Sequence, residues 1–136
     1  MTSTVNLFFA AVNIGCADPA GLADFWGKVL GRPVSPGVTA PEVVAVGTTD
    51  PGGRPQMVFH PAPEAERVIG GFVPTLQTEH HDEEVERLTG LGAKPLNQIK
   101  IPAVRAGGAT FNVSQTTFAD PEGNEFDLVI WQQQPE

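Results

Sequence analysis

A helix that ends in Leu-Gly directly before a strand occurs twice in this chain, and this repeat constrains the fold more than any other feature. The Leu-Gly pair occurs in the segments Val29–Pro33 (VLGRP) and Gly90–Lys94 (GLGAK). Its leucines, Leu30 and Leu91, are 61 residues apart (91 minus 30). A glycine just after the last helical residue is a common helix ending. The same order of elements is expected around both helices. The repeat therefore favours a duplicated βαβββ unit.

The first half is predicted to hold one amphipathic helix among short strands. Asp18 and Pro19 supply an N-cap and a proline at the first helical position. Apolar residues then recur at helical spacing: Leu22, Phe25, Trp26, Val29 and Leu30. Phe25 and Trp26 are expected in the core. The expected strands are Phe8–Ala17, Val43–Gly47 and Pro55–Pro61, with a turn at Thr48–Arg54 between the last two.

The second half is predicted to repeat this order. A strand at Gly71–Thr78, weakened by Pro74, precedes a helix at Asp82–Leu91 with acidic residues in its first turn. The segments that follow are the strand Lys94–Ile101, a loop at Pro102–Gly108, the strand Thr110–Thr117, the turn Asp120–Asn124 and the strand Glu125–Trp131. The loop lies outside the repeat, and the longer stretch Ile101–Asn112 that contains it is a candidate lid or rim.

Composition restricts the partners. Sixteen acidic against eight basic residues give a net charge of −8, and the cations do not form the basic stripe that nucleic acids need. The longest apolar run, Leu7–Val12, is far shorter than the ~20 residues of a membrane-spanning helix. No signal peptide is visible, and the single cysteine, Cys16, has no partner for an internal disulfide. We therefore expect a cytoplasmic protein that binds neither nucleic acid nor membranes.

Three motifs in order resemble the vicinal oxygen chelate superfamily, which includes glyoxalase I, bleomycin-resistance proteins and extradiol dioxygenases. They are the helix Asp18–Gly31 (DPxxLxxFWxxxLG), the segment Asp82–Ala93 and the turn Asp120–Phe126 (DPEGNEF). The resemblance is closest to the glyoxalase-like subgroup. It implies an α+β fold in which two tandem βαβββ modules, about residues 7–62 and 71–131 of a single domain 1–136, form a ligand-binding cup from curved mixed sheets. A homodimer is implied by the same analogy.

The resemblance also implies four metal-ligand positions on the first and last strands of the modules. Carried over by spacing, these positions fall on Ala11, His60, Val73 and Asp127. Alanine and valine have no donor atom, so a metal-free cup is expected. His60 and Asp127 are the residues that would hold a divalent metal (Zn, Ni, Mn or Fe) in the alternative reading, with Glu125 and Gln77 as further ligands.

Strand alternation predicts which side chains line such a cup. In the last strand, Phe126, Leu128 and Ile130 should face the helix, while Glu125, Asp127, Val129 and Trp131 face the cup. The predicted lining is Asn13, His60, Thr75, Gln77, Glu125, Asp127 and Trp131. Asp127 stands out because an acid within an apolar strand is unusual.

Other polar residues are interpreted as structural. His80 and His81 at the start of the second helix are expected to be solvated capping residues. Cys16 is expected to be a small buried strand residue, and Asp120–Asn124 is expected to serve the turn.

Three functions remain open at this point. The favoured one is a small-molecule-binding protein of the resistance or sequestration kind, metal-free, with Asn13, Thr75, Gln77 and Trp131 contacting an apolar or cationic ligand. The second is a metal-dependent lyase or isomerase of the glyoxalase type. The third is a metal-free enzyme with Asp127 or Glu125 as general base and His60 as acid.

Overall fold

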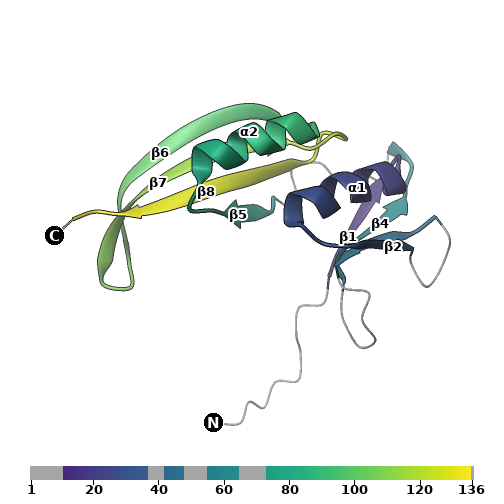
Figure 1. Ribbon diagram of the computed structural model, residues 1–136, viewed down its shortest axis with the longest axis horizontal. Helices are drawn as coiled ribbons and strands as arrows, with labels where there is room; N and C mark the ends of the chain where they lie inside the picture. The colour runs from purple at the N-terminus through teal and green to yellow at the C-terminus, as the bar shows by residue number, and fades with distance from the viewer. Residues whose placement is uncertain (1–10, 37–41, 48–54, 65–72, 136) are drawn as a thin grey trace, which may run out of the picture. The chain divides into compact units, whose positions relative to one another are not determined.

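A computed structural model describes residues 11–36, 42–47, 55–64 and 73–135 of the chain. The chain divides into two compact units, Met1–Arg67 and Val68–Glu136, and each is described by itself. The predicted turn at 48–54, the first residues of the predicted strand at 8–17 and the beginning of the predicted strand at 71–78 lie outside the described residues. Figure 1 shows one helix beside a sheet in each unit.

The first unit contains a four-stranded mixed sheet and one helix. Its elements are β1 (Val12–Cys16), α1 (Pro19–Leu30), β2 (Val34–Pro36), β3 (Val44–Gly47) and β4 (Pro55–Pro61). The strand order is β1-β4-β3-β2, in which β1 runs parallel to β4 and the other pairs are antiparallel.

The helix α1 forms where the sequence predicted it. Asp18 Oδ1 accepts a hydrogen bond of 3.2 Å from the backbone N–H of Gly21, and Pro19 occupies the first turn. Gly31 ends the helix in the left-handed conformation at φ 63°, which glycine adopts without steric cost. Phe25 and Trp26 are buried and meet edge to face, with ring centroids 5.6 Å apart. The predicted core helix is confirmed.

The second unit repeats the first in element order and in strand pairing. Its elements are β5 (Thr75–Gln77), α2 (His81–Leu91), β6 (Lys94–Ala106), β7 (Ala109–Ala119) and β8 (Glu125–Gln133). The order β5-β8-β7-β6 again has a parallel first pair and antiparallel pairs after it. The predicted tandem βαβββ modules are confirmed. That the two modules act as a single domain stays a prediction.

The core of the second unit lies between α2 and its sheet. Leu88 of α2 is buried, as are Phe118 and Phe126, whose rings stack at 5.4 Å. Asp120 in the turn between β7 and β8 is also buried, and its Oδ1 accepts hydrogen bonds of 2.9 Å from the backbone N–H groups of Glu122 and Asn124. The structural roles predicted for this turn and for buried Cys16 are confirmed.

The predicted loop at Pro102–Gly108 is wrong, because the chain forms a long hairpin there. β6 continues through Pro102 to Ala106 and pairs with β7. Ala103 has φ 58° at a bulge between Ile101 and Val104, and a two-residue turn at Gly107 and Gly108 reverses the chain with both φ angles positive. A proline is tolerated in β6 because this strand lies at the edge of the sheet, where no outer neighbour needs its missing N–H.

Candidate functional site

Each sheet has a helix face and, opposite to it, a distal face. In the second unit a hydrogen bond between His81 of α2 and Thr116 of β7 identifies the helix face. Directly paired residues of neighbouring strands point to the same side and alternate along each strand. Thr116 pairs with Leu128, so Phe126, Leu128 and Ile130 lie on the helix face. This confirms the sequence prediction for the orientation of the last strand.

The distal face of the second sheet carries five of the seven predicted lining residues. They are Thr75 and Gln77 on β5 and Glu125, Asp127 and Trp131 on β8. The pairing register arranges them in rows across the strands. One row reads Thr75, Asp127, Thr117 and Asn97, and the next reads Gln77, Val129, Gln115 and Ile99.

Asp127 lies at the polar end of this face with its carboxylate fixed in place. The hydroxyl of Thr117, its direct partner across β7 and β8, donates a hydrogen bond of 2.6 Å to Asp127 Oδ1. The backbone N–H of Asp127 donates to the carbonyl of Pro74 at 2.8 Å, which holds the strand end in register. Asp127 is half-buried, and among the described residues Thr117 is its only side-chain partner. The second carboxylate oxygen therefore remains available for a ligand.

An aromatic pair forms the other end of the distal face. The rings of Phe111 and Trp131 meet edge to face, with centroids 5.5 Å apart and an interplanar angle of 72°. Val113 and Val129 lie beside them on the same face and are buried, whereas the side chain of Trp131 is 37% exposed. This end therefore presents an indole ring on an apolar surface.

The two remaining lining residues belong to the first unit. A Cβ placed on Gly27 of α1 would lie only 2.6 Å from Val34 Cγ2, so the side chain of Val34 faces the helix. The residues that pair across the sheet in the same row share this face: Val46, Met57 and Val12. Asn13 pairs with Val58, and His60 follows two residues later opposite Gly15, so both lie on the distal face. His60 is half-buried, and its backbone carbonyl accepts a hydrogen bond of 3.7 Å from Cys16 Sγ.

The predicted acid–base set and metal set each combine residues of both units, namely His60 with Asp127 and Glu125. Both sets therefore stay predictions. Ala11 and Val73, the residues that spacing from the family motifs assigns to two of the four ligand positions, carry no donor atoms. Within residues 11–36, 42–47, 55–64 and 73–135, no group of three or more His, Cys, Asp or Glu side chains could hold a metal ion. The described residues therefore do not fit the four-ligand metal site of the superfamily.

The prediction that His81 is a solvated capping residue is wrong. Its side chain is only 9% exposed, and Nε2 lies 3.0 Å from Thr116 Oγ1 while Nδ1 lies 3.4 Å from Asp82 Oδ1. His81 belongs to the inward stripe of α2 together with Val85 and Leu88, at spacings of four and seven residues. That helical spacing is the signal that identifies it from sequence. His80, in contrast, is exposed at the N-cap and makes no side-chain capping bond.

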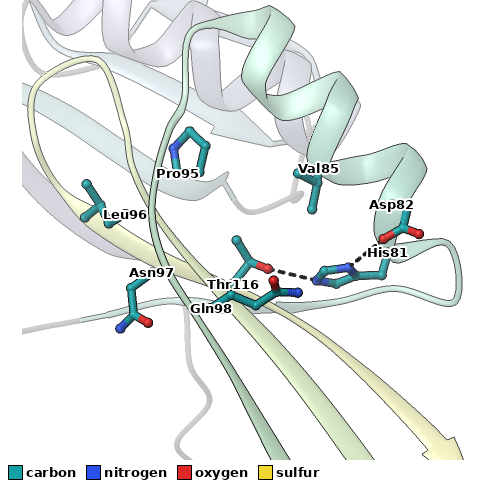
Figure 2. Close-up of a pocket in the computed structure, with 8 residues that line it drawn as sticks. All are labelled: His81, Asp82, Val85, Pro95, Leu96, Asn97, Gln98 and Thr116. Carbon is teal, nitrogen blue, oxygen red and sulfur yellow. Dashed lines mark hydrogen bonds and ion pairs between the residues drawn. The ribbon is translucent and has the colours of Figure 1, made fainter.

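A pocket of about 380 Å³ lies on the helix side of the second sheet, between the start of α2 and β6. Figure 2 shows the side chains that line it. Its lining consists of His81, Asp82, Val85, Pro95, Leu96, Asn97, Gln98 and Thr116. Both ring nitrogens of His81 face protein atoms, and the His81–Thr116 pair ties the first turn of α2 to β7. This pocket lies on the opposite face of the sheet from Asp127 and Trp131.

Sequence reasoning missed the β7 residues of the distal face, above all Thr117 and Phe111. The signal for them is the alternation of β7 itself, which places Phe111, Val113, Gln115 and Thr117 on one side. Which side that is depends on the pairing with β8, and the register is a property of the folded sheet.

Comparison with known proteins identifies the family. The model of the glyoxalase-like domain matches residues 11–129. No curated protein matches the chain significantly.

Three solved structures are similar in fold. A glyoxalase/bleomycin resistance protein/dioxygenase family enzyme from Burkholderia phytofirmans PsJN is 20% identical at a TM-score of 0.63, covering 89% of this chain and 96% of that one. The antibiotic-binding protein TnmS3 from Streptomyces sp. CB03234 is 16% identical at a TM-score of 0.57, covering 94% and 99%. The fosfomycin resistance protein FosX from Mesorhizobium loti is 13% identical at a TM-score of 0.59, covering 93% of each.

Among the described residues, neither helix is long and apolar enough to cross a membrane.

Proposed function

Because the chain belongs to the glyoxalase-like domain family of the vicinal oxygen chelate superfamily, we propose that it binds a small apolar or cationic molecule against the distal face of its second sheet, without a metal. One observation carries this proposal. The distal face of the second sheet combines a fixed carboxylate, Asp127 held by Thr117, with an aromatic pair, Phe111 and Trp131. A carboxylate attracts a cation, and an indole face binds apolar rings and cations alike.

The spacing of these two features indicates the size of the ligand. Asp127 and Trp131 are four residues apart on β8, which corresponds to about 13 Å at the usual rise of a strand. A molecule with two or three fused rings and one positive charge spans this distance. The net charge of −8 further favours a cation over an anion.

The solved relative described as an antibiotic-binding protein supports a binding role, whereas the Burkholderia relative is described as an enzyme. A third is described as a fosfomycin resistance protein. A protein that sequesters a toxic molecule needs a complementary surface and no reactive group. The distal face provides such a surface, and its polar end holds the carboxylates of Asp127 and Glu125, the first of which accepts a hydrogen bond from Thr117.

Calorimetric titration with three aromatic probes tests the proposal: proflavine as a planar cation, acridine at pH 8 as its uncharged counterpart, and 8-anilinonaphthalene-1-sulfonate as an anion. We expect proflavine to bind most tightly. Asp127→Asn should weaken proflavine binding roughly tenfold and leave acridine binding unchanged, because it removes one charge and keeps the shape. Glu86→Gln is the matched control, since Glu86 is exposed on α2 and away from the distal face.

Tryptophan fluorescence locates the bound molecule. Of the two tryptophans, Trp26 is buried at 2% exposure and Trp131 is 37% exposed, so acrylamide quenches mainly Trp131. A bound probe should protect Trp131 from quenching. If all three probes bind equally, or if Asp127→Asn and Trp131→Ala leave binding unchanged, the distal face is not the binding site.

A further inference from the structure

The long hairpin of the second unit is a basic element in an acidic protein. Between Lys94 and Ala119 the sequence has three cations, Lys94, Lys100 and Arg105, and no acidic residue. The remainder of the chain holds 16 acids and five cations (8 minus 3), a net charge of −11. None of the three cations is in a salt bridge with a described residue, and Arg105 donates only to Thr110 Oγ1, at 2.7 Å. The positive charge of the hairpin is therefore not neutralised within the described structure.

This hairpin is longer than its counterpart in the described part of the first unit. β6 and β7 have 13 and 11 residues, whereas the corresponding strands of the first unit, β2 and β3, have three and four. Figure 1 shows the β6–β7 hairpin running back along α2 and continuing past the first turn of that helix.

The two faces of β6 differ in chemistry. Lys100 pairs with Ser114 and Arg105 pairs with Thr110. Both partners alternate with Thr116 on β7, so the two cations lie on the same side of the hairpin as the helix face, opposite to the distal face. Ile99 pairs with Gln115 and Ile101 with Val113 on the distal face. Ile99 is 44% exposed and Ile101 41%, which is unusual for large aliphatic side chains. A strand lying beside β6 would therefore meet cations on one face and aliphatic side chains on the other.

The outer edge of β6 is unpaired. The strand order ends at β6, and within the described part of the chain nothing bonds to its outer backbone groups. Prolines at 95 and 102 bound the stretch Leu96–Ile101, which contains no proline and in which alternate residues direct their N–H groups away from β7. An exposed edge of this kind binds extended peptides by adding a strand to the sheet.

We propose that the edge Leu96–Ile101 binds, by strand addition, an extended segment of another protein in which acidic and aliphatic residues alternate. The acidic side chains would lie beside Lys100 and the aliphatic ones beside Ile99 and Ile101, because the alternation of the added strand matches that of β6. A second copy of this chain is a poorer occupant. Pairing two β6 edges would bring their cations together, and like charges oppose association.

Fluorescence anisotropy with labelled peptides tests this proposal on the full-length protein. The probe is an acetylated ten-residue peptide of alternating valine and glutamate. A peptide of the same composition with the two residues in blocks tests the alternation, and one of alternating valine and lysine tests the charge. We expect only the alternating acidic peptide to bind, with an affinity that falls as salt is added.

A matched pair of charge reversals locates the site. Lys100→Glu should weaken binding of the acidic peptide roughly tenfold or more. Arg32→Glu makes the same change in charge at an exposed residue of the first unit and should leave binding unchanged. Proflavine titration of both variants separates this edge from the small-molecule site, because neither cation lies on the distal face.

Several results would overturn the proposal. Equal binding of the alternating and blocked peptides would mean that charge alone attracts them. Equal effects of the two reversals would place binding elsewhere. Binding to phosphatidylserine vesicles without binding to the acidic peptide would assign the basic side to a membrane surface. A dimer, detected by light scattering and lost in Lys100→Glu, would assign the edge to a second copy.

Discussion

Thr117 and Asp127 face each other across β7 and β8, and the hydroxyl of Thr117 donates a 2.6 Å hydrogen bond to the carboxylate of Asp127. The bond fixes one oxygen of an acid that lies in β8 between the buried residues Phe126 and Leu128. It also determines the direction in which the second oxygen points. This pair thus links the stability of the second sheet to the charge that the proposed ligand would meet.

Thr117→Val should destabilise the protein by about 1 kcal/mol, because it keeps the shape of the side chain and removes a hydrogen bond to a half-buried charge. Urea denaturation followed by circular dichroism measures the change. Thr117→Ser keeps the hydroxyl and should retain most of the stability. In a double-mutant cycle with Asp127→Ala we expect a coupling energy of similar size. A coupling energy of zero would mean that the two residues do not interact.

His81→Ala should destabilise the protein by about 2–3 kcal/mol, since it opens a cavity and leaves the buried hydroxyl of Thr116 without its partner. His80→Ala is the matched control from the neighbouring position. His80 is exposed and makes no side-chain capping bond, so its loss should cost less than about 0.5 kcal/mol. Equal effects of the two substitutions in urea denaturation would contradict the buried position of His81.

Two glycines in helices should respond to alanine in opposite directions. A Cβ at Gly27 would lie 2.6 Å from Val34 Cγ2 and 3.1 Å from the carbonyl oxygen of Arg32, so Gly27→Ala should destabilise by about 1–2 kcal/mol. A Cβ at Gly90 meets nothing within 4 Å, and Gly90→Ala should stabilise α2 by about 0.5–1 kcal/mol. Thermal unfolding of the two variants gives the signs directly. Stabilisation by Gly27→Ala would show that α1 does not pack this closely against β2.

Asp120→Ala should cost about 2–3 kcal/mol, because the backbone N–H groups of Glu122 and Asn124 both donate to this buried carboxylate. Asn124 Nδ2 also donates to it, at 3.1 and 3.0 Å, and would lose its partner. Glu79→Gln, at an exposed position in the same unit, serves as the control. An unchanged urea midpoint for Asp120→Ala would show that the turn forms without its side-chain bonds.

Local signals in the sequence predicted most of the secondary structure. These signals act within one or two helical turns, so they can be recognised from the sequence alone. They are the cap at Asp18, the apolar stripe of α1 and the glycines at 31 and 92. Alternation along β8 likewise assigned Asp127 and Trp131 to one side. Sequence reasoning missed the hairpin because a proline such as Pro102 usually ends a strand. Pro102 is tolerated within β6 only because β6 lies at the edge of the sheet.

The sequence by itself determined the duplicated βαβββ order and the side of β8 on which its polar residues lie, because capping, helical spacing and strand alternation are properties of neighbouring residues. Tertiary structure decided which residues from distant strands meet. It placed Thr117 opposite Asp127, Phe111 against Trp131 and His81 beside Thr116, since register and burial depend on how separate strands and helices pack. The repeated Leu-Gly helix endings predicted two modules. That β6 continues through Pro102 and forms a long basic hairpin with β7 is visible only in the folded second unit.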